Sequence, residues 1–187
     1  MGTRSAVLAV TLSAAALAGC GGGDDTPEAI ATPKGESLIK LSSPDIESGG
    51  TIPAEFTCDG VGTRPTIVWR EVRQDAVELV MTVVDPDASD GGFTHWTIYR
   101  LPAAGGSGLA PDGQFPAGVL EGNNSAGKAG WTPPCPPEGD KAHRYVFTMY
   151  GIPKGTTLEA GAEPDAVEAV AATAVTYGRF TATYARK

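Results

Sequence analysis

The two histidines of this 187-residue chain each lie beside an aromatic residue at the start of an apolar segment. His95 lies in Thr94-His95-Trp96, and His143 comes just before Arg144-Tyr145. An imidazole titrates near pH 6.5, so it can become charged beside an anion or bind a metal ion. A third apolar segment runs into Asp85-Pro86-Asp87, which adds two carboxylates. If the three segments are neighbouring strands, their ends form a pocket of imidazoles, a phenol and a carboxylate.

Each of these residues also has a purely structural interpretation. Asp and Pro favour turns for local backbone reasons, so Asp85-Pro86-Asp87 can be only a turn. A histidine at a strand end is often a hydrogen-bonded structural residue, and Tyr145 can be a core residue. The binding hypothesis therefore depends on these side chains lying together.

The segments that would position them have the β-branched and aromatic composition of buried strands: 77–84, 94–99 and 144–150. Alternation along the last segment puts His143 and Tyr145 on one face and Arg144 on the other. Shorter strands are expected at 38–41, 66–69, 118–120 and 180–184.

One helix is predicted near the C-terminus. Asp165 is its expected N-cap, Glu168 follows three residues later, and apolar residues recur at helical spacing from Val167 to Val175. The links 102–115 and 121–142 are long, and such links in a compact domain are usually functional. The whole pattern predicts a mostly antiparallel β domain.

Composition favours one β-rich domain and argues against nucleic-acid binding. The chain has 25 Gly and 15 Pro, which favour turns over long helices. Its length suits one domain with a sizeable core. Its formal net charge is −8, and it has no Lys/Arg cluster that could neutralise nucleic-acid phosphates.

The first residues predict export. The apolar run from Ala6 to Ala18 is too short for a transmembrane helix and is typical of a signal peptide. It ends in Leu17-Ala18-Gly19-Cys20, which resembles the lipobox of bacterial lipoproteins, in which the peptide is cut before a lipidated cysteine. The alternative is an ordinary signal peptide in which Cys20 is incidental.

The lipobox interpretation divides the chain into three parts. We expect a lipoprotein signal peptide over 1–19, a lipidated flexible tether over 20–37 and a globular domain over 38–187. The domain would be anchored by lipid to the cell envelope and would face outward.

If Cys20 carries lipid, Cys58 and Cys135 are the two remaining cysteines. In an oxidising compartment, such a pair favours a disulfide over two free thiols or a metal pair. The bridge would tie the loop around Cys58 to the Pro-rich loop 133–137, and both loops could form walls of the pocket.

Motifs in four separated places resemble the phosphatidylethanolamine-binding protein family. They are Phe56-Thr57-Cys58-Asp59-Gly60, Asp85-Pro86-Asp87-Ala88, Phe93-Thr94-His95-Trp96, and Pro134-Cys135-Pro136-Pro137 with His143-Arg144-Tyr145-Val146-Phe147. The first is similar to the opening of the bacterial, Raf kinase inhibitor-like branch. The similarity runs from about Leu41 to Tyr184. It implies a central antiparallel β-sheet flanked by a second, smaller sheet, with one or two short helices.

The resemblance also implies a small anion pocket for phosphate-bearing headgroups. The family's ligand-binding positions fall on Asp85, Asp87, His95, Pro137, His143 and Tyr145. This chain departs from the family's pattern at Ser89, where Pro is usual, and at Pro133, where Gly is usual. Proline has no N–H, so a backbone donor to the anion is missing at Pro133.

Together these observations favour a non-catalytic, membrane-tethered protein that binds a small anionic or phosphate-bearing headgroup and needs no cofactor. Asp85 would orient a histidine N–H or accept the ammonium of a zwitterionic ligand such as phosphoethanolamine. The sequence has no Gly-x-Ser-x-Gly nucleophile elbow, which argues against a hydrolase.

Two other functions stay open. An inhibitor or envelope interaction module, acting on a kinase, a protease or another partner, would use the surface of the domain. A metal-assisted hydrolase would use His95, His143 and Asp85 as three ligands, with an open position for water. The two histidines lack the short spacing of common zinc motifs.

Overall fold

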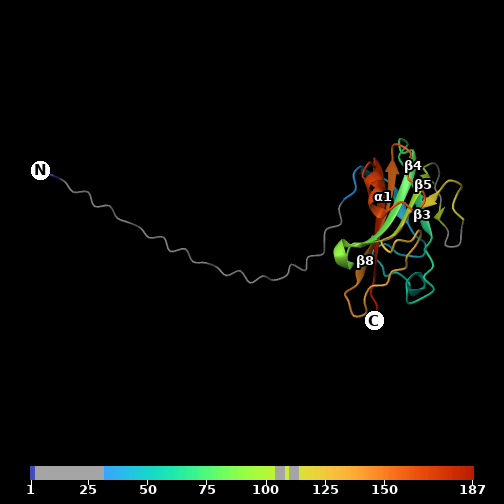
Figure 1. The fold of residues 1–187 in the computed structure, drawn as a ribbon, viewed down its shortest axis with the longest axis horizontal. Helices are drawn as coiled ribbons and strands as arrows, with labels where there is room; N and C mark the ends of the chain where they lie inside the picture. The colour runs from blue at the N-terminus through green and yellow to red at the C-terminus, as the bar shows by residue number, and fades with distance from the viewer. Residues whose placement is uncertain (3–31, 104–107, 110–113) are drawn as a thin grey trace.

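The structure is a computed structural model that describes residues 1–2, 32–103, 108–109 and 114–187 (Figure 1). The predicted signal peptide beyond its first two residues, Cys20 and most of the predicted tether lie outside these described residues. None of the helices in the described part of the chain is long and apolar enough to cross a bilayer.

The described chain forms two β-sheets and a few short helices. The elements are β1 Glu36–Ser37, β2 Lys40–Ser42, η1 Ala54–Phe56, β3 Ile67–Arg70, β4 Glu78–Asp85, η2 Ser89–Gly91, β5 Phe93–Pro102, β6 Gly108–Leu109, β7 Leu120–Glu121, β8 His143–Ile152, α1 Pro164–Ala171 and β9 Thr176–Tyr184. The large sheet has the order β1-β9-β8-β4-β5-β7, and the small sheet has the order β2-β3-β6. All paired neighbours are antiparallel except β1 and β9.

Both faces of the large sheet are covered, which explains why its central strands are nearly continuous apolar runs. On one face, Met81 and Phe147 belong to the same core as Trp69 of the small sheet. On the other face, Val80 packs in a second core with Val167 of α1. Figure 1 shows α1 and β3 on opposite sides of the large sheet.

The predicted architecture is confirmed, with the parallel strand β1 as the exception. The three long predicted strands correspond to β4, β5 and β8, with slightly different ends. The shorter predictions at 38–41, 66–69, 118–120 and 180–184 correspond to β2, β3, β7 and β9. The two-residue strands β1 and β6 have no counterpart among the predictions.

The helix differs from its prediction at both ends. Glu163 is the N-cap and Pro164 the first helical residue, so the expectation that Asp165 caps the helix is wrong. Proline suits the first position because its fixed φ is helical and its missing N–H leaves no donor unpaired. The helix ends at Ala171, and the Ala174 N–H then bonds the Ala171 carbonyl in a tighter turn.

Strand β1 extends the domain toward the N-terminus. Glu36 and Ser37 pair with Thr176 and Tyr177 of β9, although the predicted tether runs to residue 37. The preceding Gly35 has φ +93° and passes so close to the backbone of Val175 that a Cβ atom would clash. The sheet therefore includes residues 36 and 37, the last two residues of the predicted tether.

Candidate binding site

A cavity of about 520 Å³ lies where β4 ends and where β5 and β8 begin. These strand ends meet at one edge of the sheet because β4 is antiparallel to both of its neighbours. The loop from Thr132 to Asp140 lines the cavity from the side. All six candidate residues line this one cavity: Asp85, Asp87, His95, Pro137, His143 and Tyr145.

His95 reaches the cavity through a β-bulge in β5. Val83 pairs with Trp96 and Val84 pairs with Thr94, so His95 has no partner in β4. A bulge lets two consecutive residues face the same side of a sheet. Trp96 packs in the main core, and His95 beside it lines the cavity on that same side. In a regular strand, His95 would face α1 instead.

Asp85 fixes the orientation of the His143 ring. The His143 Nδ1–H donates to Asp85 Oδ2 at 2.8 Å, because a carboxylate can only accept. The other oxygen of Asp85 accepts the backbone N–H groups of Asp87 at 2.9 Å and Ala88 at 3.1 Å. Asp85 is only 3% exposed, so its charge is buried but fully hydrogen-bonded. The Nε2 atom of His143 is left for a ligand, with Asp140 Oδ2 3.9 Å away.

The His95 ring is held in the same way by a different partner. Its Nδ1–H donates to the Thr132 carbonyl at 2.7 Å, which leaves Nε2 without a hydrogen bond to the described residues. Burial lowers the pKa of His95, and the Thr132 carbonyl and the Asp85 charge oppose this shift only in part. Because the lowered pKa favours the uncharged form, an anion that approaches Nε2 would raise that pKa again.

Tyr145 brings an unsatisfied hydroxyl to the cavity. Its side chain is fully buried, and its hydroxyl makes no hydrogen bond of good geometry to the described residues, with the Asp85 carboxylate nearby. Its ring packs edge-on against His95, with the ring centroids 5.2 Å apart. Burial, and then the negative charge of Asp85, raise the pKa of Tyr145, so the phenol stays protonated and can donate. A buried polar group without a partner costs about 1–3 kcal/mol, which a ligand could recover.

Asp87 lines the cavity, but both of its carboxylate oxygens bind Arg144. Asp87 Oδ2 accepts the Nε–H of Arg144 at 2.8 Å, and Oδ1 lies 2.5 Å from Nη2. The Arg144 side-chain hydrogen bond is the main cause that lowers the pKa of Asp87. The expected alternation is confirmed, since Arg144 is half-buried while His143 and Tyr145 are buried. The sequence analysis missed this ion pair, which fixes the loop after β4 to the start of β8.

Comparison with known families agrees with this architecture. A model of the family described as phosphatidylethanolamine-binding protein matches residues 42–185. The chain belongs to the phosphatidylethanolamine-binding protein (PEBP) family.

Similar PEBP-type chains occur in distant organisms. LppC of Mycobacterium tuberculosis, whose name marks it as a candidate lipoprotein, is 36% identical over 185 residues and covers 90% of both chains. A UPF0098 protein of Pyrococcus abyssi is 32% identical over 82% of this chain and 88% of its own length.

Two solved structures share the fold. The candidate PEBP homologue CT736 of Chlamydia trachomatis aligns with a TM-score of 0.72 at 32% identity, over 81% of this chain and all of its own. YbcL of Escherichia coli, described as a new member of the mammalian PEBP family, aligns with a TM-score of 0.74 at 27% identity and the same coverage.

Both departures from the usual PEBP motifs lie at the cavity. Ser89, the first residue of η2, is exposed and lines the cavity mouth. Pro133 also lines it, and Gly62, at φ +74°, packs against the Pro133 ring so closely that a Cβ would clash. Pro133 therefore replaces a backbone donor with a rigid apolar wall, supported from behind by the 60–62 loop.

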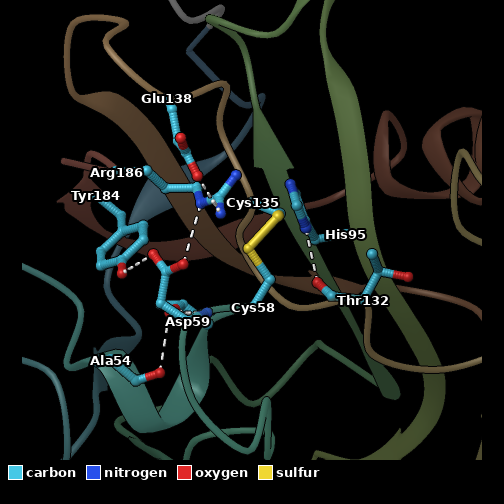
Figure 2. The surroundings of a disulfide bond; sticks show 10 residues. Ala54, Cys58, Asp59, His95, Thr132, Cys135, Glu138, Tyr184 and Arg186 are labelled. Atoms are coloured by element: carbon cyan, nitrogen blue, oxygen red, sulfur yellow. Dashed lines mark hydrogen bonds and ion pairs between the residues drawn. A yellow bond between two sulfur atoms is a disulfide. The ribbon is translucent and has the colours of Figure 1, made fainter.

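The structure contains the Cys58–Cys135 disulfide, which ties this loop to the cavity wall (Figure 2). The two Cα atoms are 5.3 Å apart, and Cys135 itself lines the cavity. Sequence analysis missed a second link beside it. Asp59 accepts the Tyr184 hydroxyl at 2.7 Å and the Arg186 Nε–H at 3.1 Å, and Arg186 Nη2 lies 2.9 Å from Glu138. The C-terminal residues thus hold both loops together.

The metal-assisted alternative finds no support in this geometry. Among the described residues, no three His, Cys, Asp or Glu side chains are grouped so that they could hold a metal ion. His95, His143 and Asp85 line one cavity, but the Asp85 oxygens and both Nδ1 atoms are used in hydrogen bonds within the protein. The cavity therefore presents hydrogen-bonding groups to a ligand.

Proposed function

We propose that this cavity binds a small phosphate-bearing molecule or headgroup without chemically changing it. The observation that supports the proposal most strongly is a set of three polar atoms that make no hydrogen bond to the described residues, with only the exposed Asp140 carboxylate 3.9 Å from His143 Nε2. His95 Nε2 and His143 Nε2 belong to rings whose other nitrogen is fixed, and the buried Tyr145 hydroxyl makes no hydrogen bond of good geometry to the described residues. Oriented, unpaired groups around a cavity are typical of a preformed ligand site.

The groups that line the cavity favour an anion whose binding is accompanied by protonation of an imidazole. Among the described residues that line it there is no lysine or arginine, so the positive charge would have to come from the imidazoles. The negative charge of Asp85 is balanced by two backbone N–H groups and His143, which limits its repulsion of a phosphate. We therefore expect binding to tighten as the pH falls and the imidazoles take up protons.

The lining also supports binding without catalysis. Cys135 is in a disulfide and cannot act as a thiolate nucleophile. Ser89 has no hydrogen bond to a base in the described structure, so its hydroxyl is not activated. Nothing else in the described lining forms a nucleophile–base pair, which a hydrolase of this kind would need.

The test is a calorimetric titration of inorganic phosphate and phosphoethanolamine into the full chain carrying Cys20→Ser. His95→Ala and His143→Ala should each weaken phosphate binding by about tenfold, since charge-assisted hydrogen bonds contribute roughly 1.5–3 kcal/mol each. Thr94→Ala is the matched control, because Thr94 is adjacent to His95 but faces the other side of the sheet. Equal losses in the control and in the histidine variants, or no binding by the parent protein, would refute the proposal.

We also propose that a lipid on Cys20 anchors the domain to the outward-facing side of a membrane. The lipobox-like sequence and the similarity to LppC support this proposal. Cys20→Ser should move the protein from the membrane fraction to the soluble envelope fraction or the medium. Identical fractionation of the two forms would contradict the anchor and would leave the phosphate-binding proposal untouched.

A further inference from the structure

A second cavity lies on the opposite face of the same strands, between the large sheet and α1. We call it the α1 cavity; its volume is about 380 Å³, which is within the range of small-molecule sites. Thr82 and Val84 of β4 and Thr94 and Thr97 of β5 line it from the sheet, and Asp165 and Glu168 line it from α1. Phe93 lines both this cavity and the His95 cavity.

The α1 cavity contains hydroxyl groups that the protein itself does not use. Thr82 is 92% buried, and its hydroxyl has no hydrogen-bond partner among the described residues. The hydroxyls of Thr94 and Tyr150 likewise have no partner there, and Ser125 Oγ accepts one bond, from the Thr94 N–H, and keeps its own hydrogen free. An unpaired hydroxyl on a buried threonine that lines a cavity is a group to which a ligand can hydrogen-bond.

The carboxylates of the α1 cavity are unpaired among the described residues, whereas Asp85 and Asp87 at the His95 cavity are bonded to His143 and Arg144. Asp165 and Glu168 make no ion pair with any described residue, and no Lys, Arg or His is among the described residues that line the cavity. A carboxylate in the first turn of a helix complements its dipole, which accounts for Asp165 but not for Glu168, one turn further along. That dipole does not account for the hydroxyls on the facing sheet, and the two carboxylates would repel a phosphate.

We propose that the α1 cavity is a binding site for a sugar ring, with an amino sugar preferred. Ring hydroxyls can donate to Asp165 and Glu168 and exchange hydrogen bonds with Thr82, while the C–H face of the ring packs on Val84 and Phe93. An ammonium group on the ring would add attraction to the carboxylates. This site is distinct from the phosphate site, because the two cavities lie on opposite faces of the sheet and share only Phe93 among their lining residues.

The experiment follows backbone amide NMR signals of the full chain carrying Cys20→Ser while D-glucosamine, D-glucose or inorganic phosphate is added. Glucosamine should shift the Ser125 and Glu168 amides, glucose should shift the same amides more weakly, and phosphate should leave them in place. The Cys135 and Asp140 amides, at the other cavity, should not respond to either sugar. The proposal would be overturned if the sugars shifted amides over the whole surface or did not shift those of Ser125 and Glu168. It would also be overturned if phosphate shifted these two amides as much as the sugars do.

Substitutions make the test specific. Thr82→Val keeps the shape of the side chain, removes only its hydroxyl and should weaken glucosamine binding by about fivefold. Thr148→Val is its control, because Thr148 pairs directly with Thr82, is also buried and does not line the cavity, although its Oγ1 accepts the Arg179 Nε–H. Equal effects of the two substitutions on glucosamine binding would overturn the proposal.

The carboxylates are tested separately. Glu168→Gln should weaken glucosamine binding by about threefold, as expected for an exposed ionic contact, and should weaken glucose binding less. Glu159→Gln makes the same charge change at an exposed glutamate that does not line the cavity. Because all these variants lie outside the His95 cavity, phosphate binding should be unchanged in each of them. An equal loss of glucosamine binding in Glu159→Gln and Glu168→Gln would contradict a role for the α1 carboxylate.

Discussion

The two faces of the large sheet carry cavities built from alternating residues of the same strands. On the small-sheet side, Asp85 and His95 contribute a buried carboxylate and an imidazole with a free nitrogen. On the α1 side, Thr82 and Thr94 contribute hydroxyls that face two carboxylates. The difference shows that strand alternation, with one bulge, is enough to give the two faces of one sheet cavities with different polar groups.

The bulge at His95 is the feature that separates the two cavities chemically. Without it, the imidazole would join the hydroxyls on the α1 side, and the other cavity would lose one of its two histidines. The small-sheet side also has a covalent link in its wall, the Cys58–Cys135 disulfide, whereas no disulfide is found near the described residues of the α1 cavity. The two sites should therefore respond differently to the same perturbations.

The largest expected effect follows removal of the disulfide. The bridge joins residues 77 apart in sequence, so the double variant Cys58→Ser/Cys135→Ser should lose up to about 4 kcal/mol of unfolding free energy in urea. In the folded protein, phosphate binding should weaken because Cys135 lines that cavity, and glucosamine binding should stay unchanged. An unfolding midpoint equal to that of the Cys20→Ser parent would contradict the stabilising role of the bridge.

The second effect concerns the role of Asp85. In Asp85→Asn, the amide oxygen can still accept the two backbone N–H groups, while the amide nitrogen can donate to His143 Nδ1. That change moves the histidine hydrogen to Nε2, where it can donate to phosphate without a positive charge. The gain in phosphate affinity between pH 8 and pH 6 should therefore be smaller in Asp85→Asn than in the parent protein.

Calorimetry at the two pH values measures this difference. Phosphoethanolamine tests the second expected role of Asp85, which is to accept the ammonium group of the ligand. Loss of the Asp85 charge should weaken the binding of this zwitterion. A pH dependence identical to that of the parent protein would show that Asp85 does not control the tautomer of His143.

A smaller effect distinguishes the roles of two buried tyrosines, Tyr99 and Tyr145. The Tyr99 hydroxyl donates to the Glu159 carbonyl at 2.5 Å and accepts the Ala162 N–H at 3.3 Å, so Tyr99→Phe should cost about 1–3 kcal/mol of stability. Tyr145→Phe removes a hydroxyl that makes no hydrogen bond of good geometry to the described residues, so stability should change by less than about 0.5 kcal/mol. Phosphate affinity should fall about fivefold in Tyr145→Phe alone. The reverse pattern would make Tyr145 a structural residue.

The smallest effect is a pH dependence of stability. Burial lowers the pKa of His95 in the folded state, while in the unfolded chain it stays near 6.5. The unfolded chain therefore binds the proton first, and stability is lost as the pH falls from about 6.5 toward the folded pKa. Comparing urea unfolding of the parent and His95→Gln at pH 7.5 and 5.5 isolates this loss, which added phosphate should reduce. The expected role of His95 would be contradicted if the parent protein lost no more stability than His95→Gln between pH 7.5 and pH 5.5.

Most of the fold could be predicted because its central strands are buried on both faces. The apolar runs of β4, β5 and β8 are long enough to identify, and the motifs around Asp85, His95 and His143 point to one site. The bulge at His95 could not be predicted, since it depends on the pairing register with β4. The two-residue strands β1 and β6 likewise have too few residues to show a pattern.

The polar network around the cavity was harder to predict than its lining. Alternation correctly placed Arg144 away from the cavity, but it does not show that its guanidinium reaches Asp87 in the loop after β4. The link from Arg186 to Asp59 and Glu138 depends on the position of the C-terminal residues, which no local pattern indicates. A proline directly after Glu163, by contrast, is a local signal that favours Glu163 over Asp165 as the N-cap.

The most direct test of the central claim is the pKa of His95, measured by NMR with and without inorganic phosphate in the Cys20→Ser full chain. Burial lowers the pKa of His95 in the empty cavity, and a phosphate at its Nε2 should raise that pKa clearly. Phosphate that binds while the pKa of His95 stays unchanged, or that fails to bind at pH 6, would contradict the account.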